Sequence, residues 1–195
     1  MQVLKNIFQV GGDINGITFD VPDALWNDGN SYILKTEGGL IMFDCGCGDT
    51  MEQIFNNMRY WDLQPEDIRY CILTHPHYDH AGGAHILKER GVKLVAIGET
   101  ADAVASGDER CCGYLYHKIF SPVTVDQLVK DGEKFTLLGV EIEVMHLPGH
   151  SMGCTAFLFE WTGKKLVISG DVIGTMLVGD FGWDGSIDFD KKIYN

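Results

Sequence analysis

A cluster of three histidines and one aspartate constrains this chain more than any other feature. Residues 74 to 83 read Thr-His-Pro-His-Tyr-Asp-His-Ala-Gly-Gly, so His75, His77, Asp79 and His80 fall within six positions. His75 and His77 are two apart, and on an extended segment their side chains leave the same side of the backbone. Asp79 and His80 follow where the chain should turn towards a helix. The pattern therefore predicts two neighbouring half-sites for metal ions on one loop.

Two further candidate ligands stand at the ends of apolar runs. The strand expected over Val140 to Met145 is followed by His146-Leu-Pro-Gly-His150, and its Pro-Gly pair predicts a tight turn that presents His150 at the strand end. The apolar run from Leu166 to Ser169 leads into Gly170 and Asp171, which places a carboxylate just beyond another strand.

The order of these elements is similar to that of a known family. Asp44 in Phe-Asp-Cys-Gly, then the HxHxDH loop, His150 and Asp171 resemble motifs one to four of the metallo-β-lactamase-fold hydrolases, over residues 32 to about 174. The resemblance implies an α/β protein with the αββα four-layer arrangement, in a single domain over residues 1 to 195. It also implies that Asp44 orients metal-binding imidazoles without touching the metal.

The resemblance implies a dinuclear zinc hydrolase, with iron or manganese as alternative metals. One ion would be held by His75, His77 and His150; the second by Asp79 and His80, with Asp171 bridging both. Two dications against two carboxylates leave positive charge that favours ionising a bridging water. We expect this hydroxide to attack a small ester, lactone, thioester or amide, with Asp79 as the catalytic proton shuttle.

The family's fifth motif, a histidine completing the second metal site, has no counterpart in this chain. The seven histidines stand at positions 75, 77, 80, 85, 117, 146 and 150. The sequence also ends at Asn195, inside what reads as the first turn of a helix. We therefore expect a C-terminally incomplete domain, and an inactive truncated metal-binding fragment is one alternative function.

Two features of the sequence point to different substrates. Lactamase branches of the family usually carry Cys or Ser where this chain has Asp171, and an aspartate there suits thioesterases and lactonases. The segment from Glu99 to Gly107 and the long insert after it nevertheless resemble the B3 lactamase layout. Another alternative is a mononuclear iron enzyme of the persulfide dioxygenase type, using only His75, His150 and Asp171.

Composition narrows the class of partner. The net charge of −13 repels phosphate backbones and anionic membranes, so we expect a small-molecule substrate and neither nucleic acid nor membrane as partner; the oligomeric state stays open. No secretory signal is visible at the N-terminus, and no apolar run of about 18 residues occurs. We therefore expect a cytoplasmic protein with reduced cysteines, in which Cys45 and Cys47 are structural.

Periodicity predicts the secondary structure. Strands are expected near residues 2–10, 31–36, 39–44, 68–73, 92–97, 134–145, 154–160 and 165–169, helices over 50–61, 84–90 and 99–106, and irregular structure over 107–127. His85 and His146 are expected to be packed or solvated, and His117 is a candidate lid residue. Large apolar residues among glycines after residue 174 predict a substrate rim formed by Met176, Phe181 and Trp183.

Overall fold

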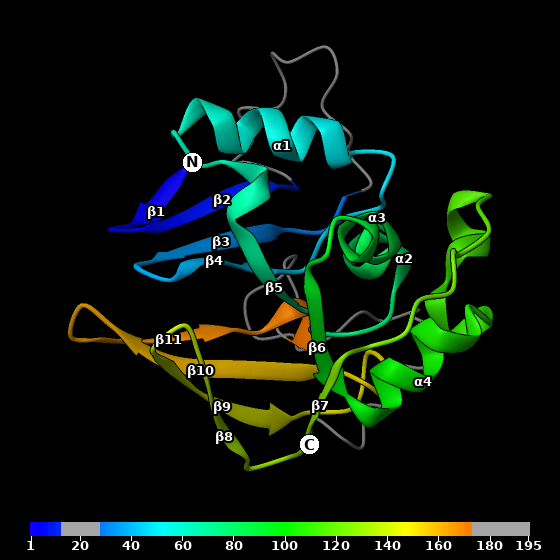
Figure 1. Cartoon of the computed structure of the whole chain (residues 1–195). Helices are drawn as coiled ribbons and strands as arrows, with labels where there is room; N and C mark the ends of the chain where they lie inside the picture. The colour runs from blue at the N-terminus through cyan, green and yellow to red at the C-terminus, as the bar shows by residue number, and fades with distance from the viewer. Residues whose placement is uncertain (13–27, 173–195) are drawn as a thin grey trace, which may run out of the picture.

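Two β-sheets pack face to face in the computed structural model, which describes residues 1–12 and 28–172 (Figure 1). The first sheet has seven strands in chain order: β1 (Gln2–Leu4), β2 (Ile7–Gly11), β3 (Ser31–Thr36), β4 (Gly39–Phe43), β5 (Ile68–Ile72), β6 (Lys93–Ile97) and β7 (Gln127–Val129). The second has the order β11-β10-β9-β8: β8 (Lys134–Leu137), β9 (Val140–His146), β10 (Thr155–Trp161) and β11 (Lys164–Ile168).

Helices cover the outer face of the first sheet. They are α1 (Met51–Tyr60), α2 (Tyr78–Ala81), α3 (Ala84–Glu89) and α4 (Gly98–Ser106), with 3-10 turns η2 (Pro65–Asp67), η3 (Glu109–Cys111), η4 (Gly113–Tyr116) and η5 (Gly170–Val172). The described residues thus form a helix layer and two sheets, and the α/β class is confirmed. None of the described helices is long and apolar enough to cross a bilayer.

Strand direction decides where the candidate ligands meet. β4, β5, β6 and β7 are parallel, so their carboxyl ends share one edge of the first sheet. β9 and β11 both pair antiparallel with β10 and therefore run the same way, which brings their carboxyl ends to one edge of the second sheet. The loops after β5, β9 and β11 are those that carry the predicted ligands.

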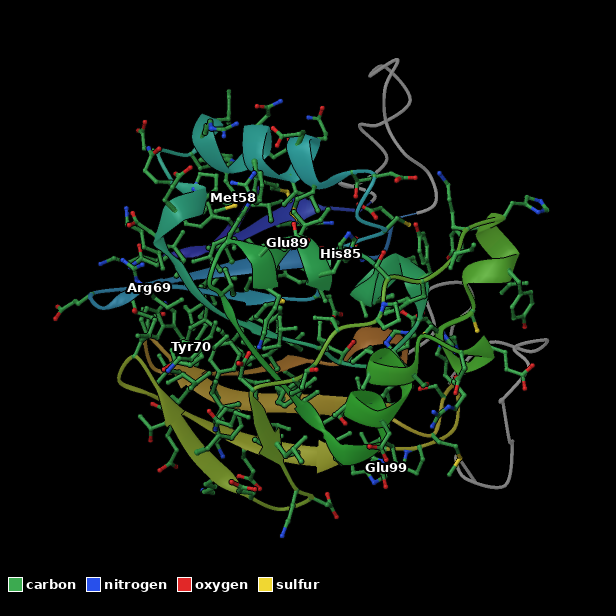
Figure 2. All side chains as sticks on the ribbon, turned by 45° about the vertical axis from the view of Figure 1, so that its right-hand side comes forward. Met58, Arg69, Tyr70, His85, Glu89 and Glu99 are labelled. Atoms are coloured by element: carbon green, nitrogen blue, oxygen red, sulfur yellow. The ribbon has the colours of Figure 1, made fainter. Side chains whose placement is uncertain are left out.

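Two apolar clusters hold the layers together. One lies between the helices and the first sheet, and the expected amphipathic helix contributes its buried Met51, Ile54, Phe55 and Met58. Met58 points from α1 towards this sheet in Figure 2. The other cluster fills the space between the sheets, where the rings of Phe43 and Phe159 stack with centroids 5.6 Å apart. This contact joins the two sheets directly.

Two of the sequence expectations for the strands were wrong in detail. The strand expected over residues 2 to 10 is two strands, because Asn6 adopts a left-handed conformation (φ 65°) and the chain reverses there. β8 and β9 are likewise separated by a two-residue turn, in which Leu138 and Gly139 both have positive φ. The short strand β7 and the 3-10 turns were not expected, since β7 forms only by pairing with β6.

Candidate metal centre

The predicted ligands converge where the carboxyl edges of the two sheets meet. The loop after β5 carries His75 and His77, and α2 follows at once with Asp79 and His80. Among the described residues, two groups place one ligand atom of each member within 4.8 Å of the others: His75, His77 and His150, and His75, His80 and Asp171. Residues from both sheets therefore face one small volume.

The first group consists of three buried imidazoles. The ring centroids of His75 and His77 are 4.7 Å apart, and those of His77 and His150 are 4.6 Å apart. Nε2 of His150 lies 2.9 Å from Nδ1 of His77. Three nitrogen ligands with room for a further ligand form the donor set of catalytic zinc sites.

Asp171 joins this group to the second one. Its Oδ1 lies 3.3 Å from Nε2 of His80, and its Oδ2 lies 3.4 Å from Nε2 of His150. Asp79 is adjacent, with Oδ2 3.5 Å from Nε2 of His80. The tight second group, however, includes His75 where the sequence had suggested Asp79.

Asp44 fixes the orientation of two of the imidazoles. Its Oδ2 lies 2.8 Å from Nδ1 of His80 and accepts a hydrogen bond from the Thr74 hydroxyl at 2.7 Å. Because that hydroxyl donates to Asp44, it can only accept from Nδ1 of His75, 3.0 Å away. Both histidines then carry their proton on Nδ1, so each Nε2 is left with a lone pair for a metal ion.

The buried Nε2 of His75 provides a test of whether a cation fits. This nitrogen is inaccessible to solvent and has no hydrogen-bond partner among the described residues. An unsatisfied buried polar atom costs about 1–3 kcal/mol, so such atoms are rare unless a ligand uses them. A divalent cation bound by nitrogen and carboxylate ligands suits this position.

Electrostatics within the cluster also favour positive charge. Burial, together with the neighbouring His80 and His77, holds the pKa of His75 well below its ordinary value. Burial lowers the pKa of His80 as well, but the carboxylates of Asp171, Asp79 and Asp44 outweigh it and raise that pKa well above the ordinary value. The carboxylates around His80 thus favour positive charge at this position.

Two glycines allow the backbone to approach the centre closely. A Cβ on Gly29 would lie 2.5 Å from Nε2 of His80, and the Gly29 amide donates to the Asp79 carbonyl at 2.9 Å. Gly170 has φ 51°, and a Cβ there would lie 2.4 Å from the Thr74 hydroxyl. Gly170 therefore lets η5 bring Asp171 against the loop of the first sheet.

Sequence reasoning missed Tyr116. Its ring packs against that of Tyr78, with centroids 5.4 Å apart, and burial together with the nearby Asp79 carboxylate raises the pKa of Tyr116 far above its ordinary value. The Tyr-rich loop had suggested His117 as a lid residue, but the structure leaves His117 exposed. The aromatic spacing in this loop was the available signal, yet it could not show which side chain turns inward.

The other predicted residues lie away from the ligand groups or outside the described ranges. His85, labelled on α3 in Figure 2, places Nδ1 3.0 Å from the Gly82 carbonyl, and Nε2 of His146 lies 2.8 Å from the Met152 carbonyl. Cys45 and Cys47 are buried free thiols. The expected rim residues Met176, Phe181 and Trp183 lie outside the described residues, so that expectation stays a prediction.

The sequence matches the profile of the metallo-β-lactamase superfamily over residues 24–194, most of its length. The chain belongs to this superfamily. Its described residues include a histidine-aspartate cluster that could hold a metal ion.

Solved structures of superfamily members resemble the chain closely in fold. A Cronobacter sakazakii metallo-β-lactamase with an HARLDQ motif is 27% identical, with a TM-score of 0.71 over 87% of this chain and 61% of its own. BJP-1, a subclass B3 metallo-β-lactamase of Bradyrhizobium japonicum, is 28% identical, with a TM-score of 0.70 over 96% of this chain and 69% of that one. FEZ-1 from Legionella gormanii is 24% identical and shares the fold, with a TM-score of 0.73. The match covers 100% of this chain and 71% of FEZ-1.

The chain therefore spans about three-fifths of the length of the Cronobacter enzyme. Its similarity to subclass B3 structures agrees with the layout noted in the sequence after Glu99.

Proposed function

We propose that this chain is a dinuclear zinc hydrolase acting on a small ester, lactone, thioester or amide. The observation that supports the proposal is the position of Asp171, whose two carboxylate oxygens face His80 and His150 in different half-sites. A carboxylate shared in this way suits two neighbouring cations, because one oxygen is available to each.

Each predicted ligand has a role in this proposal. His75, His77 and His150 would hold the first ion, and Asp79, His80 and Asp171 the second. When bound, zinc supplies Lewis acidity and lowers the pKa of water to about 7, so a hydroxide nucleophile is available at neutral pH. Asp79 Oδ2, beside Nε2 of His80, would hold the proton taken from water until the leaving group needs it.

Two observations favour a small acyl substrate. The relatives are named metallo-β-lactamases, and a β-lactam is a strained cyclic amide. The acidic chain, at a net charge of −13, favours a small substrate over a nucleic acid. We propose testing a cephalosporin, a homoserine lactone and an acyl thioester side by side. The preferred substrate would show whether the protein acts as a lactamase, a lactonase or a thioesterase.

Elemental analysis tests the metal assignment. Protein reconstituted with excess zinc should contain close to two equivalents of zinc and should lose hydrolysis on chelation. One persistent equivalent would contradict the dinuclear assignment. One equivalent of iron, with activity towards persulfides instead of acyl substrates, would identify the mononuclear dioxygenase alternative.

We also propose that Met176, Phe181 and Trp183 form the rim of the substrate pocket, as the sequence predicts. Comparing Trp183→Ala with the unaltered protein on short and long acyl substrates should show a loss of kcat/KM confined to the longer chain. An equal loss on both, with a lower melting temperature, would show that Trp183 is a core residue.

A further inference from the structure

The loop that carries His150 is closed by hydrogen bonds of its own. At its ends, Leu147 donates its backbone N–H to the Cys154 carbonyl at 2.8 Å, and inside it the Ser151 N–H lies 3.3 Å from Sγ of Cys154. These bonds give residues 147–154 a definite shape. They do not by themselves fix where the loop lies relative to the two histidines that follow β5, because those belong to the other sheet.

The loop is tied to the first sheet by hydrogen bonds at its C-terminal end. Thr155 donates its backbone N–H to the carbonyl of Thr74, the residue before His75, at 3.0 Å. The Thr100 hydroxyl donates to the Gly153 carbonyl, also at 3.0 Å. Thr100 is fully buried in the first turn of α4, next to Glu99, which is labelled in Figure 2.

The contact between α4 and the loop is close enough to require a glycine. A Cβ on Gly153 would lie 2.2 Å from Oγ1 of Thr100 and 3.0 Å from its backbone nitrogen. Helix α4 itself packs on the first sheet, because Ala103 and Val104 belong to the outer apolar cluster. The Thr100 hydroxyl therefore connects the loop of the second sheet to a helix that the first sheet holds in place.

We propose that Thr100 is a positioning residue for His150. By holding the Gly153 carbonyl, its hydroxyl keeps the loop at the distance that sets Nε2 of His150 2.9 Å from Nδ1 of His77. Both nitrogens belong to the group that would hold the first zinc ion, and in this respect the inference rests on the proposed function. The first half-site draws its ligands from both sheets, so its geometry depends on such a connection between them.

Thr100→Val tests this inference, because valine has the shape of threonine without the hydroxyl. The Gly153 carbonyl also accepts from the Thr155 hydroxyl at 3.0 Å, so the variant does not leave that carbonyl unsatisfied. In a zinc titration against a competing chelator, the first equivalent should bind roughly three- to tenfold more weakly, because zinc must then hold the loop without this hydrogen bond. Thr100→Ser restores the hydroxyl and should recover most of the affinity.

Thr155→Val is the matched control. It removes the other hydroxyl from the same carbonyl, but Thr155 lies two residues from Gly153, so its side chain helps to shape the loop and does not tie it to α4. This variant should bind zinc as the wild-type protein does. Equal losses in both variants would overturn the inference, as would wild-type zinc affinity in Thr100→Val or a failure of Thr100→Ser to recover it.

A wild-type protein that binds no zinc would contradict the proposed function, and a crystal structure of metal-free Thr100→Val protein then decides this inference separately. A longer distance between Nε2 of His150 and Nδ1 of His77 than in the metal-free wild type would support the positioning role. An unchanged distance would overturn it.

Discussion

At the scale of single residues, the centre depends on a few side chains that each serve two neighbours. Asp171 faces His80 with one oxygen and His150 with the other. Asp44 orients His80 directly and His75 through the Thr74 hydroxyl. Changing one such residue should therefore affect both halves of the centre, whereas changing a single histidine should affect mainly its own half.

Asp171→Ala should abolish hydrolysis and leave the fold largely intact, because the residue lies in η5 beyond the end of β11. Steady-state kinetics of the variant check the loss of hydrolysis, and thermal melting checks that the fold is intact. Retention of more than about a tenth of the wild-type kcat, a cost of only ~1.4 kcal/mol, would show that this carboxylate does not hold the reactive centre.

Gly29→Ala should disturb the second half-site without touching a ligand. The new Cβ would lie 2.5 Å from Nε2 of His80, and the ring cannot move away freely because Asp44 holds its Nδ1 at 2.8 Å. We expect the second zinc equivalent to bind more weakly by about tenfold or more in a chelator competition. Gly98→Ala is the control, since a Cβ there meets nothing within 4 Å; identical behaviour of the two variants would refute the steric argument.

At the scale of elements, the short parallel strand β7 is held to its neighbour by a side chain as well as by the ladder. Asp126, just before β7, accepts from the Leu94 amide at 2.8 Å through Oδ2, donates its own N–H to the Leu94 carbonyl, and pairs with Lys88 of α3. One aspartate thus ties together β6, β7 and α3. A three-residue strand has too few ladder bonds of its own to fix its register firmly.

Asp126→Asn should lower the free energy of unfolding by about 0.5–1 kcal/mol at neutral pH, a value that allows for solvent screening of a partly exposed pair. Burial raises the pKa of Asp126, but the hydrogen bonds from Lys88 and Leu94 outweigh it and hold the pKa below its ordinary value. The stabilisation is therefore present above the unfolded-state pKa, about 3.9, and is lost as the pH falls through the lower folded-state value.

Urea unfolding at several pH values measures this difference. The gap between Asp126→Asn and wild type should narrow as the solution is made more acidic than about pH 4. Asp67→Asn, which removes an exposed pair with Arg69 at 3.8 Å, is the control and should show little change at any pH. A pH-independent gap would mean that Asp126 acts through packing alone.

At the scale of the whole molecule, the candidate centre links the two sheets. His75, His77 and His80 follow a strand of the first sheet, whereas His150 and Asp171 follow strands of the second. The inner apolar cluster holds the sheets together over their facing surfaces. A bound ion adds a second connection at the edge, where each sheet supplies part of the ligand set.

Zinc should therefore raise the melting temperature. A ligand present at about 100 times its Kd stabilises the folded state by ~2.7 kcal/mol, which corresponds to roughly 5–10 °C for a domain of this size. Differential scanning calorimetry with and without a chelator measures the shift. A His77→Ala, His150→Ala double variant should show a much smaller shift, and an unchanged one would place the stabilising ion elsewhere.

The sequence by itself determined the chemistry and much of the local structure. His75, His77, Asp79 and His80 fall within six consecutive positions, so a single turn of the chain is enough to bring them together. The apolar spacing of α1 likewise predicted its buried face, because helical periodicity is a local property.

Tertiary structure alone decided which distant groups meet. Asp171 joins the histidines because β9 and β11 run in the same direction beside β10, and strand order cannot be read from local patterns. Gly29 approaches His80, and Tyr116 packs against Tyr78, through packing of loops far apart in the chain. Side-chain periodicity carries no information about such contacts, because they arise only after the sheets and loops have packed together.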